Sequence, residues 1–518
     1  MKNGIFILVA SVCYTFLLYQ QGIGVNVLLL NLVLLTSLFI SNKHYLKNKM
    51  ALLFAFGALF SSVFAFVNGH FLTVITNIIS LTFLSISINL KQQTILTSLF
   101  HVAYSYFTAV AEIIKRAKMK YFNESPANNI LRKKVVIYLS SIVVLALFVT
   151  LYQASNITFR YFMEQFNLKF LSFHLLFFYS ISFVLMYAFF RPRIVAVLSI
   201  YEKTLPLNIS PTYFQSYKFL GNEIEEETEF KTGIVMLGLL NGLLLLVNIL
   251  DMQFLFNATA LPINITYAEF VHQGIFSLIL SIIIAIAIII WYFRGTQNFA
   301  KQKTLKTLAY LWIAQNAIML LSAAYKNNLY INEYSLTYKR IGVYVFLICT
   351  LAGLLFTAIK LINKQSNFYL LKNNSLAWYI ILVLSVPFSW DKTIAEFNIA
   401  QAAYKHKKPD LDYLYSLSYQ ALPTILNYEF KRENQGNLEE FGRKFYTTNY
   451  NGTKPSKLLL NLNSILQFEE HYTWQSYNLQ RCNGYDELDK CLAKVPFLQH
   501  STLSNQLKLL ATYRNLNW

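Results

Sequence analysis

The feature that most constrains this chain is a series of apolar blocks, about 15 to 21 residues each, that runs through its first 390 residues. A helix rises 1.5 Å per residue, so about 20 apolar residues cross the roughly 30 Å hydrocarbon layer of a membrane. Charged residues are 13% of the chain, against about 25% in soluble domains. The pattern predicts an all-α, polytopic transmembrane bundle.

We expect about 11 spans within a transmembrane domain at 1–390, followed by a separate domain at 391–518. The predicted spans are 4–19, 25–40, 50–67, 71–89, 135–154, 170–190, 234–250, 275–293, 307–325, 341–359 and 376–390.

The connecting segments predict the orientation. With the N-terminus inside, the inside segments hold 24 Lys and Arg, and the outside loops before residue 391 hold five. Cytoplasmic loops of membrane proteins carry such an excess of positive charge. The bias therefore predicts a cytoplasmic N-terminus in the bacterial cytoplasmic (inner) membrane, and it explains the net charge of +19 without nucleic acid as a partner.

The segment 94–114 is predicted to be an interfacial helix that does not cross. Its apolar residues recur at helical spacing, while His101, Ser105, Thr108 and Glu112 occupy the other face. This is the pattern of an amphipathic helix in the membrane interface. A crossing here would also place the seven Lys and Arg of 115–134 outside, against the charge bias.

Residues 391–518 differ in kind. They hold 15 Lys and Arg and 13 Asp and Glu, and no 18-residue apolar run. We predict a small α-helical soluble domain on the extracytoplasmic side, able to bind an envelope protein. Cys482 and Cys491 lie in this domain. In an oxidising compartment they form a disulfide, and otherwise they are two free thiols.

Motifs for catalysis and metal binding are absent. The sequence has no Walker A loop, no GxGxxG, no HExxH, no CxxC and no GxSxG. We therefore expect no cofactor and no metal, and the bilayer as the main partner.

Polar residues instead gather near one predicted membrane face. A carboxylate beside a histidine on one helix face can do acid–base work, whereas hydrogen-bonded residues that fix helix ends are the plainer interpretation. Arg340 opposite Glu333 or Asp251 would be a structural ion pair. The candidate cluster is Asp251, Glu269, His272, Glu333 and Arg340, with Tyr267, Gln273, Tyr334 and Thr337 as secondary candidates.

Inside the predicted spans the polar residues are uncharged. Asn241, Asn248, Gln315 and Asn316 either form hydrogen bonds between helices or line a path for a solute. No Asp, Glu, Lys or Arg lies at the middle of a predicted span, which argues against an ion-coupled pump.

Several stretches resemble a bacterial membrane family named domain of unknown function 4173, which is related to domain of unknown function 4153. The resemblance rests on NGLLLLVNILD (241–251), YAEFVHQG (267–274), Arg294-Gly295, LWIAQN (311–316), YINEYSLTYKRIGVY (330–344) and DYLYSLSYQALP (412–423). It implies an integral membrane protein of a bacterial cell envelope, and no catalytic assignment.

Three functions compete at this level. The missing motifs and the separate C-terminal domain favour a non-enzymatic component that senses, scaffolds or assembles in the envelope. The polar cluster favours an enzyme acting on a lipid or lipid-linked substrate at the outer leaflet. A solute transporter is the third alternative, with little support from spans that carry no embedded charge.

Overall fold

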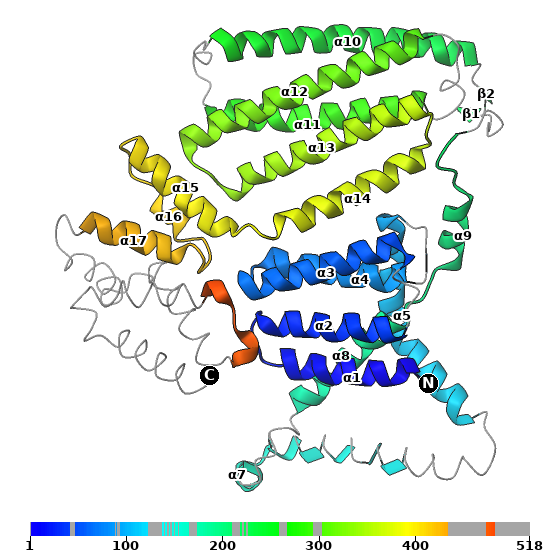
Figure 1. Cartoon of the computed structure of the whole chain (residues 1–518), viewed down its shortest axis with the longest axis vertical. Helices are drawn as coiled ribbons and strands as arrows, with labels where there is room; N and C mark the ends of the chain where they lie inside the picture. Colours follow the sequence, from blue (N-terminus) through cyan, green and yellow to red (C-terminus); the bar gives the residue numbers. More distant parts are fainter. Residues whose placement is uncertain are drawn as a thin grey trace. The chain divides into compact units, whose positions relative to one another are not determined.

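In the computed structural model, the residues that can be described are helical almost throughout (Figure 1). The one sheet within its described residues is an antiparallel pair of two-residue strands, β1 (Lys218–Phe219) and β2 (Asn222–Glu223). The structure describes residues 2–41, 47–88, 90, 94–122, 137–138, 140–141, 144–145, 148–149, 151–153, 155–164, 173–209, 218–219, 222–223, 226–257, 267–293, 303–433 and 473–481.

The chain divides into two compact units. Unit 1 comprises 1–93, 97–199 and 459–518, and unit 2 comprises 94–96 and 200–458. Unit 1 contains α1 (Lys2–Leu18), α2 (Val25–Ser41), α3 (Lys49–Val67), α4 (Phe71–Ser87), most of α5 (Ile95–Phe122), α7 (Ile157–Glu164), α8 (Phe173–Phe190) and a short 3-10 helix, η4 (Trp474–Ser476).

The helices of unit 1 pack through small residues and expose large ones. Helix α1 packs on α2 and α8, α2 on α3, and α3 on α4. Ala58 and Ser61 of α3 are fully buried, whereas Phe56 of the same helix is 59% exposed. Membrane helices associate through small residues because lipid offers their large apolar side chains an equally good environment. The surface of unit 1 is therefore suited to lipid.

Asn31 and Asn77 fix three of these helices together. Asn31 of α2 and Asn77 of α4 donate to each other at 3.1 and 3.2 Å. Asn77 also donates to the Ala58 carbonyl of α3 at 2.8 Å. Both asparagines are buried. Their hydrogen bonds therefore set the register of α2, α3 and α4 among apolar side chains.

The η4 segment, residues 473–478, binds the turns that connect helices of unit 1. The Val25 N–H donates to the Tyr477 carbonyl at 2.9 Å, and Asn478 donates to the Ala65 carbonyl at 3.0 Å. A side chain at position 24 would lie 2.3 Å from the Tyr477 carbonyl, so the α1–α2 turn needs Gly24 to admit this segment. The turns after α1 and α3 are thus both bound by residues 473–478.

Unit 2 is a second helical bundle. Helix α12 packs on α10, α11 and α13, and α13 packs on α14. Its apolar core is built on Leu237, Ile289, Phe293, Trp312 and Leu354. Its helices are α9 (Ala196–Thr204, from Ile200 onward), α10 (Glu226–Asn257), α11 (Tyr267–Tyr292), α12 (Thr304–Tyr334), α13 (Tyr338–Asn363), α14 (Asn367–Ser385), α15 (Trp390–Tyr404), α16 (Leu411–Leu414) and α17 (Leu422–Glu433).

The first part of residues 391–518, the C-terminal segment, packs on the helices of unit 2. Ile394 and Ala395 of α15 pack with Leu414, Leu417 and Ile425 in a small core of their own. Leu336 and Ile341, beside the junction of α12 and α13, pack against it. The boundary predicted at residue 390 stays a prediction.

Among the described residues, four helices are long and apolar enough to cross a membrane, or five if one bent pair counts as a span. The four are Lys49–Val67, Glu227–Gln253, Thr304–Tyr334 and Tyr338–Asn363, and the shorter apolar helices are Gly4–Leu18, Val25–Ser41, Phe71–Ser87, His174–Phe190 and Leu280–Tyr292. The prediction of an all-α bundle is confirmed, and the count of about 11 spans is not.

Some predicted boundaries differ from the structure. The span at 376–390 lies in α14, which begins at Asn367 and ends at Ser385, so Trp390 starts α15 instead. Pro387 cannot continue a helix, and the two helices meet at 67°. The helix predicted at 94–114 runs on to Phe122 because Lys, Arg and Ala at 115–118 favour helix. Much of the span at 135–154 lies outside the described residues.

Candidate functional site

The polar contacts of unit 2 concentrate on the α12–α13 connector, the three residues Ser335, Leu336 and Thr337. Asn398 of α15 binds this connector with both ends of its amide. It accepts from the Leu336 N–H at 2.6 Å and donates to the Leu336 carbonyl at 2.9 Å. Asn398 is buried. The side chain therefore pairs with the connector as a neighbouring strand would.

Arg340 closes the C-terminal end of α12. Its guanidinium lies 4.1 Å from the centre of the Tyr330 ring and 6.0 Å from that of Tyr334. It also donates to the Tyr334 carbonyl at 2.6 Å and to the Ser335 carbonyl. The last carbonyls of a helix carry partial negative charge and have no helical donor. A buried cation at this point satisfies them.

Asp391 links α13, α15 and the segment after α16. Its carboxylate accepts from the Tyr338 hydroxyl at 2.8 Å and from the Ser418 hydroxyl at 2.5 Å. The Tyr338 N–H donates to the Tyr413 hydroxyl at 3.3 Å. Burial raises the pKa of the Tyr413 phenol above its ordinary value. The carboxylate thus joins elements from three parts of the chain.

Glu333 lies at the rim of the same region. Its carboxylate oxygens are 3.8 Å from the Lys405 Nζ and 3.5 Å from the Lys407 Nζ. Lys405 also donates to the Asn332 carbonyl. Glu333 and Lys407 are largely exposed, so these ion pairs contribute little stability. They place the end of α15 beside the end of α12.

Asp251 lies within α10, in a separate cluster. Its carboxylate pairs with the Lys326 Nζ at 2.7 Å and accepts from the Ser322 hydroxyl at 2.8 Å, both on α12. The side chains of Lys326 and Asp251 are only 14% and 19% exposed. In a pair this well buried, each charge compensates the desolvation of the other. Removing either partner would leave the remaining charge buried without compensation, which destabilises the fold.

A row of amides continues this contact along α10 and α12. Gln315 donates to the Asn241 side chain at 2.8 Å, and Asn241 donates to the Leu308 carbonyl at 3.0 Å. Asn248 donates to the Gln315 carbonyl at 3.2 Å. Asn316, in contrast, bonds to Trp312 of its own helix at 2.7 Å. Three of the four predicted polar span residues therefore bridge these two helices.

The structure separates the described members of the predicted cluster. Asp251 pairs with Lys326, Glu333 with two lysines of the C-terminal segment, and Arg340 with carbonyls and tyrosine rings. The ion pair expected between Arg340 and either acid is replaced by these contacts. Thr337 is the N-cap of α13 without a side-chain cap bond. The side chains of Tyr267, Glu269, His272 and Gln273, and residues Cys482 and Cys491, lie outside the described part.

Lys360 is a site residue that the sequence did not single out. Its side chain is fully buried near the end of α13. Its Nζ donates to the Phe293 carbonyl just after α11 at 3.1 Å and to the Asn367 side chain on α14 at 2.5 Å. The charge count treated Lys360 as part of an inside loop. In the structure its side chain joins the ends of three helices. The continued apolar pattern at Leu361 and Ile362 signals that the helix runs past residue 359.

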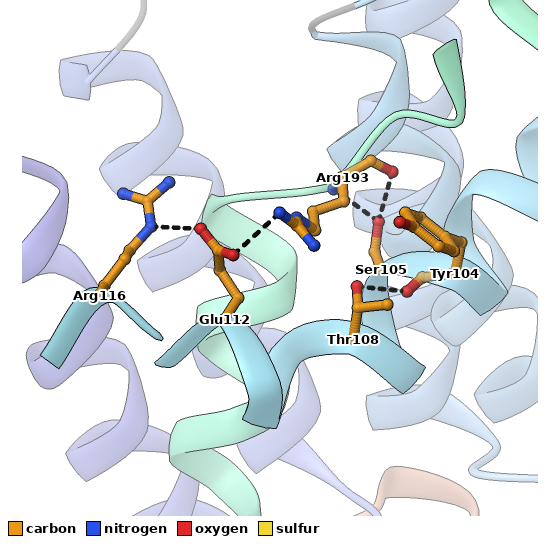
Figure 2. Close-up of polar contacts among 6 residues, drawn as sticks. All are labelled: Tyr104, Ser105, Thr108, Glu112, Arg116 and Arg193. Atoms are coloured by element: carbon orange, nitrogen blue, oxygen red, sulfur yellow. Dashed lines mark hydrogen bonds and ion pairs between the residues drawn. The ribbon is translucent and has the colours of Figure 1, made fainter. Parts of the chain in front are cut away.

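A second polar cluster lies in unit 1, on α5 (Figure 2). Glu112 accepts from the Arg116 Nε at 2.8 Å, and its other oxygen lies 2.9 Å from a terminal nitrogen of Arg193. The Ser105 hydroxyl accepts from the Arg193 N–H at 2.7 Å. The hydrogen bond from Arg116, and then the charge of Arg193, lower the pKa of Glu112. Sequence analysis placed Ser105 and Glu112 on a polar face but could not identify Arg193 as their partner.

Among the described residues, most of these polar groups already have a hydrogen-bond or ion-pair partner within the protein. The buried charged groups at the connector are engaged with backbone or with side chains of another helix. Within the same residues, no three His, Cys, Asp or Glu side chains gather closely enough to hold a metal ion. The geometry is that of a junction between helices.

The fold and the connector define a class: an all-helical bundle protein whose apolar helices are compatible with an integral membrane protein. Residues 6–428 match a family described as "Domain of unknown function (DUF4153)". The match covers most of the chain, so this protein belongs to that family. The resemblance to domain of unknown function 4173 stays a prediction. No curated protein and no solved structure matches the chain.

Proposed function

We propose that this chain is a multi-pass protein of the bacterial cytoplasmic membrane that acts as a sensing, scaffolding or assembly component of the cell envelope. In this proposal the N-terminus is cytoplasmic and the segment 391–518 is the extracytoplasmic working part. About 11 helices cross the membrane, the shorter ones in a locally thinned bilayer or with little tilt.

The contacts of the C-terminal segment support its assignment to the outside. In unit 1, residues 473–478 bind the turns that follow α1 and α3. In unit 2, Asn398 of α15 binds the α12–α13 connector, and Tyr413 of α16 accepts from the N–H of Tyr338 at the start of α13. The charge bias independently assigns each of these turns to the outer side. The contacts and the charge bias, taken together, therefore support an outer C-terminal segment.

The observation that carries the proposed role is the pair of contacts that Asn398 makes with the α12–α13 connector and Asp391 makes with the start of α13. Asn398 accepts one hydrogen bond from Leu336 and donates another to it, and Asp391 accepts from Tyr338 at the start of α13. A ligand or partner that moves α15 must therefore pull on the ends of α12 and α13. Such a linkage suits transmission between an outer segment and the membrane helices.

Affinity purification of the full-length protein from its own membranes in mild detergent tests this role. We expect a stoichiometric envelope partner, and we expect Asn398→Ala to reduce its recovery while the protein stays folded. Lys392→Gln is the matched control, because Lys392 is a half-exposed neighbour on α15 that pairs only weakly with Glu396 at 3.8 Å.

Absence of any stoichiometric partner, or equal recovery with Asn398→Ala and with the control, would overturn the proposal. Cellular assays then address the enzyme alternative. Full function of both Glu269→Ala and His272→Ala would remove an outer-leaflet enzyme that relies on those two side chains.

A further inference from the structure

Helix α5 has its polar side against the protein and its apolar side exposed. His101 and Ser105 are fully or almost fully buried, and Glu112 is 9% exposed. Phe100 and Phe107, toward the opposite face, are 63% and 88% exposed. A helix that lay on a protein in water would show the reverse pattern. Among the described residues nothing covers this outward apolar stripe, so it suits an apolar lipid neighbour.

The polar side of α5 is bonded to the segment that follows α8. The Val195 N–H donates to the His101 Nδ1 at 3.1 Å, and the Ser105 hydroxyl donates to the Arg193 carbonyl at 2.9 Å. Glu112 adds its ion pair with Arg193. Figure 2 shows Ser105, Glu112 and Arg193 meeting along one side of the helix. The orientation of α5 is thus fixed, with Phe107 turned outward.

Glu112 also holds two arginines in place. It meets one nitrogen of each guanidinium, Nε of Arg116 and a terminal nitrogen of Arg193. A guanidinium carries five N–H donors, so each retains donors for another oxygen ligand. The side chains of Arg116 and Arg193 are 50% and 40% exposed. One carboxylate between two arginines leaves a net positive charge there.

We infer that α5 lies in the cytoplasmic interface of the membrane, where Arg116 and Arg193 bind the phosphate headgroup of an anionic lipid. The exposed stripe at Phe100 and Phe107 enters the acyl region beneath it. Guanidinium groups pair with phosphate oxygens in two-pronged geometry, and anionic lipids attract basic segments at the cytoplasmic surface. The inference rests on the proposed membrane location and adds a lipid-binding site with a stated ligand class.

A fluorescent reporter on α5 tests the site. Phe107→Cys carries a bimane label in full-length protein whose Cys13, Cys349, Cys482 and Cys491 are replaced by serine. The protein is reconstituted in bilayers that contain brominated phosphatidylglycerol or brominated phosphatidylcholine, both of which quench bimane on contact. We expect quenching by both lipids, and stronger quenching by phosphatidylglycerol.

Two substitutions separate the headgroup site from the membrane location. Arg116→Gln and Arg193→Gln should each weaken the phosphatidylglycerol preference about fivefold, the factor that corresponds to ~1 kcal/mol per basic residue at a membrane surface. Quenching by phosphatidylcholine should persist. Lys231→Gln is the control, because Lys231 is an exposed cation of α10 paired with exposed Glu227, and it should keep the preference.

Failure to quench with either lipid would overturn the placement of α5. Equal quenching by both lipids, or a preference that survives the double variant, would overturn the headgroup site. If the cysteine-free protein does not fold, native mass spectrometry of the wild type and the Arg116→Gln/Arg193→Gln variant compares retained phosphatidylglycerol directly. None of these outcomes depends on a partner of the C-terminal segment.

Discussion

Asn398 and Leu336 form a two-point hydrogen-bonded pair. The Leu336 N–H donates to the asparagine oxygen at 2.6 Å, and the asparagine nitrogen donates to the Leu336 carbonyl at 2.9 Å. The two residues are 62 positions apart in the chain. This single side chain therefore fixes a connector between two long apolar helices to a helix of the polar C-terminal segment.

Removing this pair should loosen the connector. Asn398→Ala leaves two partly buried backbone groups without their partner, which costs about 1–3 kcal/mol. Asn398→Asp keeps the acceptor and loses the donor, so it should also destabilise. Thermal unfolding in detergent measures both effects, with Lys392→Ala on the same helix as control. A midpoint for Asn398→Ala equal to that control would contradict the structural role.

The planar shape of Arg340 should matter as much as its charge. Arg340→Lys keeps the positive charge but loses the stack on Tyr330 and the double donation to the Tyr334 and Ser335 carbonyls. We expect a loss of about 1–2 kcal/mol in unfolding free energy. Lys339→Gln changes an exposed neighbour and should have little effect. A lysine variant as stable as wild type would show that charge alone suffices.

The Asp251–Lys326 pair should show strong energetic coupling. Asp251→Asn or Lys326→Gln alone leaves a mostly buried charge without its partner, at a cost of about 3–5 kcal/mol. The double variant should lose less than the sum of the two. The Glu227–Lys231 pair is the control, because its side chains are 75% and 71% exposed and its coupling should stay within about 1 kcal/mol. Equal coupling energies in the two cycles would refute the burial argument.

Stability should depend on acid pH through Glu112. The hydrogen bond from Arg116 holds the pKa of Glu112 below its ordinary value. Its contribution is therefore fully present above the ordinary glutamate pKa and is lost as pH falls through the lowered one. Melting of wild type and Glu112→Gln from pH ~7 to pH ~3 brackets the ordinary value of about 4.3. The stability difference should shrink toward the acid end, and a constant difference would contradict this assignment.

The predicted topology assigns opposite sides to two exposed positions. A membrane-impermeant maleimide added to intact cells should modify Tyr404→Cys in the C-terminal segment, whose native side chain is 86% exposed. It should miss Lys303→Cys, which precedes α12 in an inside segment, until the cells are permeabilised. The reverse labelling pattern would overturn the orientation and the outer placement of the C-terminal segment together.

Much of the helical layout was predictable from local sequence. Apolar periodicity and length place α2 and α3 within about two residues of the predicted spans. Pro387 also signals the bend after α14, because its ring excludes a continued helix, although the predicted span 376–390 ran through it. The outward apolar stripe of α5 follows from residues three and four apart sharing a helix face. These features depend only on near neighbours in the chain, so the sequence alone determines them.

The pairing of polar groups was decided by tertiary structure. Arg340 meets the end of α12 and its tyrosine rings, while Asp251 selects Lys326 and Glu112 selects Arg193. Along the chain, each charged residue has several residues of opposite charge at similar sequence separation. The sequence does not indicate which of them it will pair with. Partners are fixed only when helices pack, because a few ångströms then decide which desolvated charge is compensated. The sequence thus determined which helices form, and packing determined which polar side chains meet.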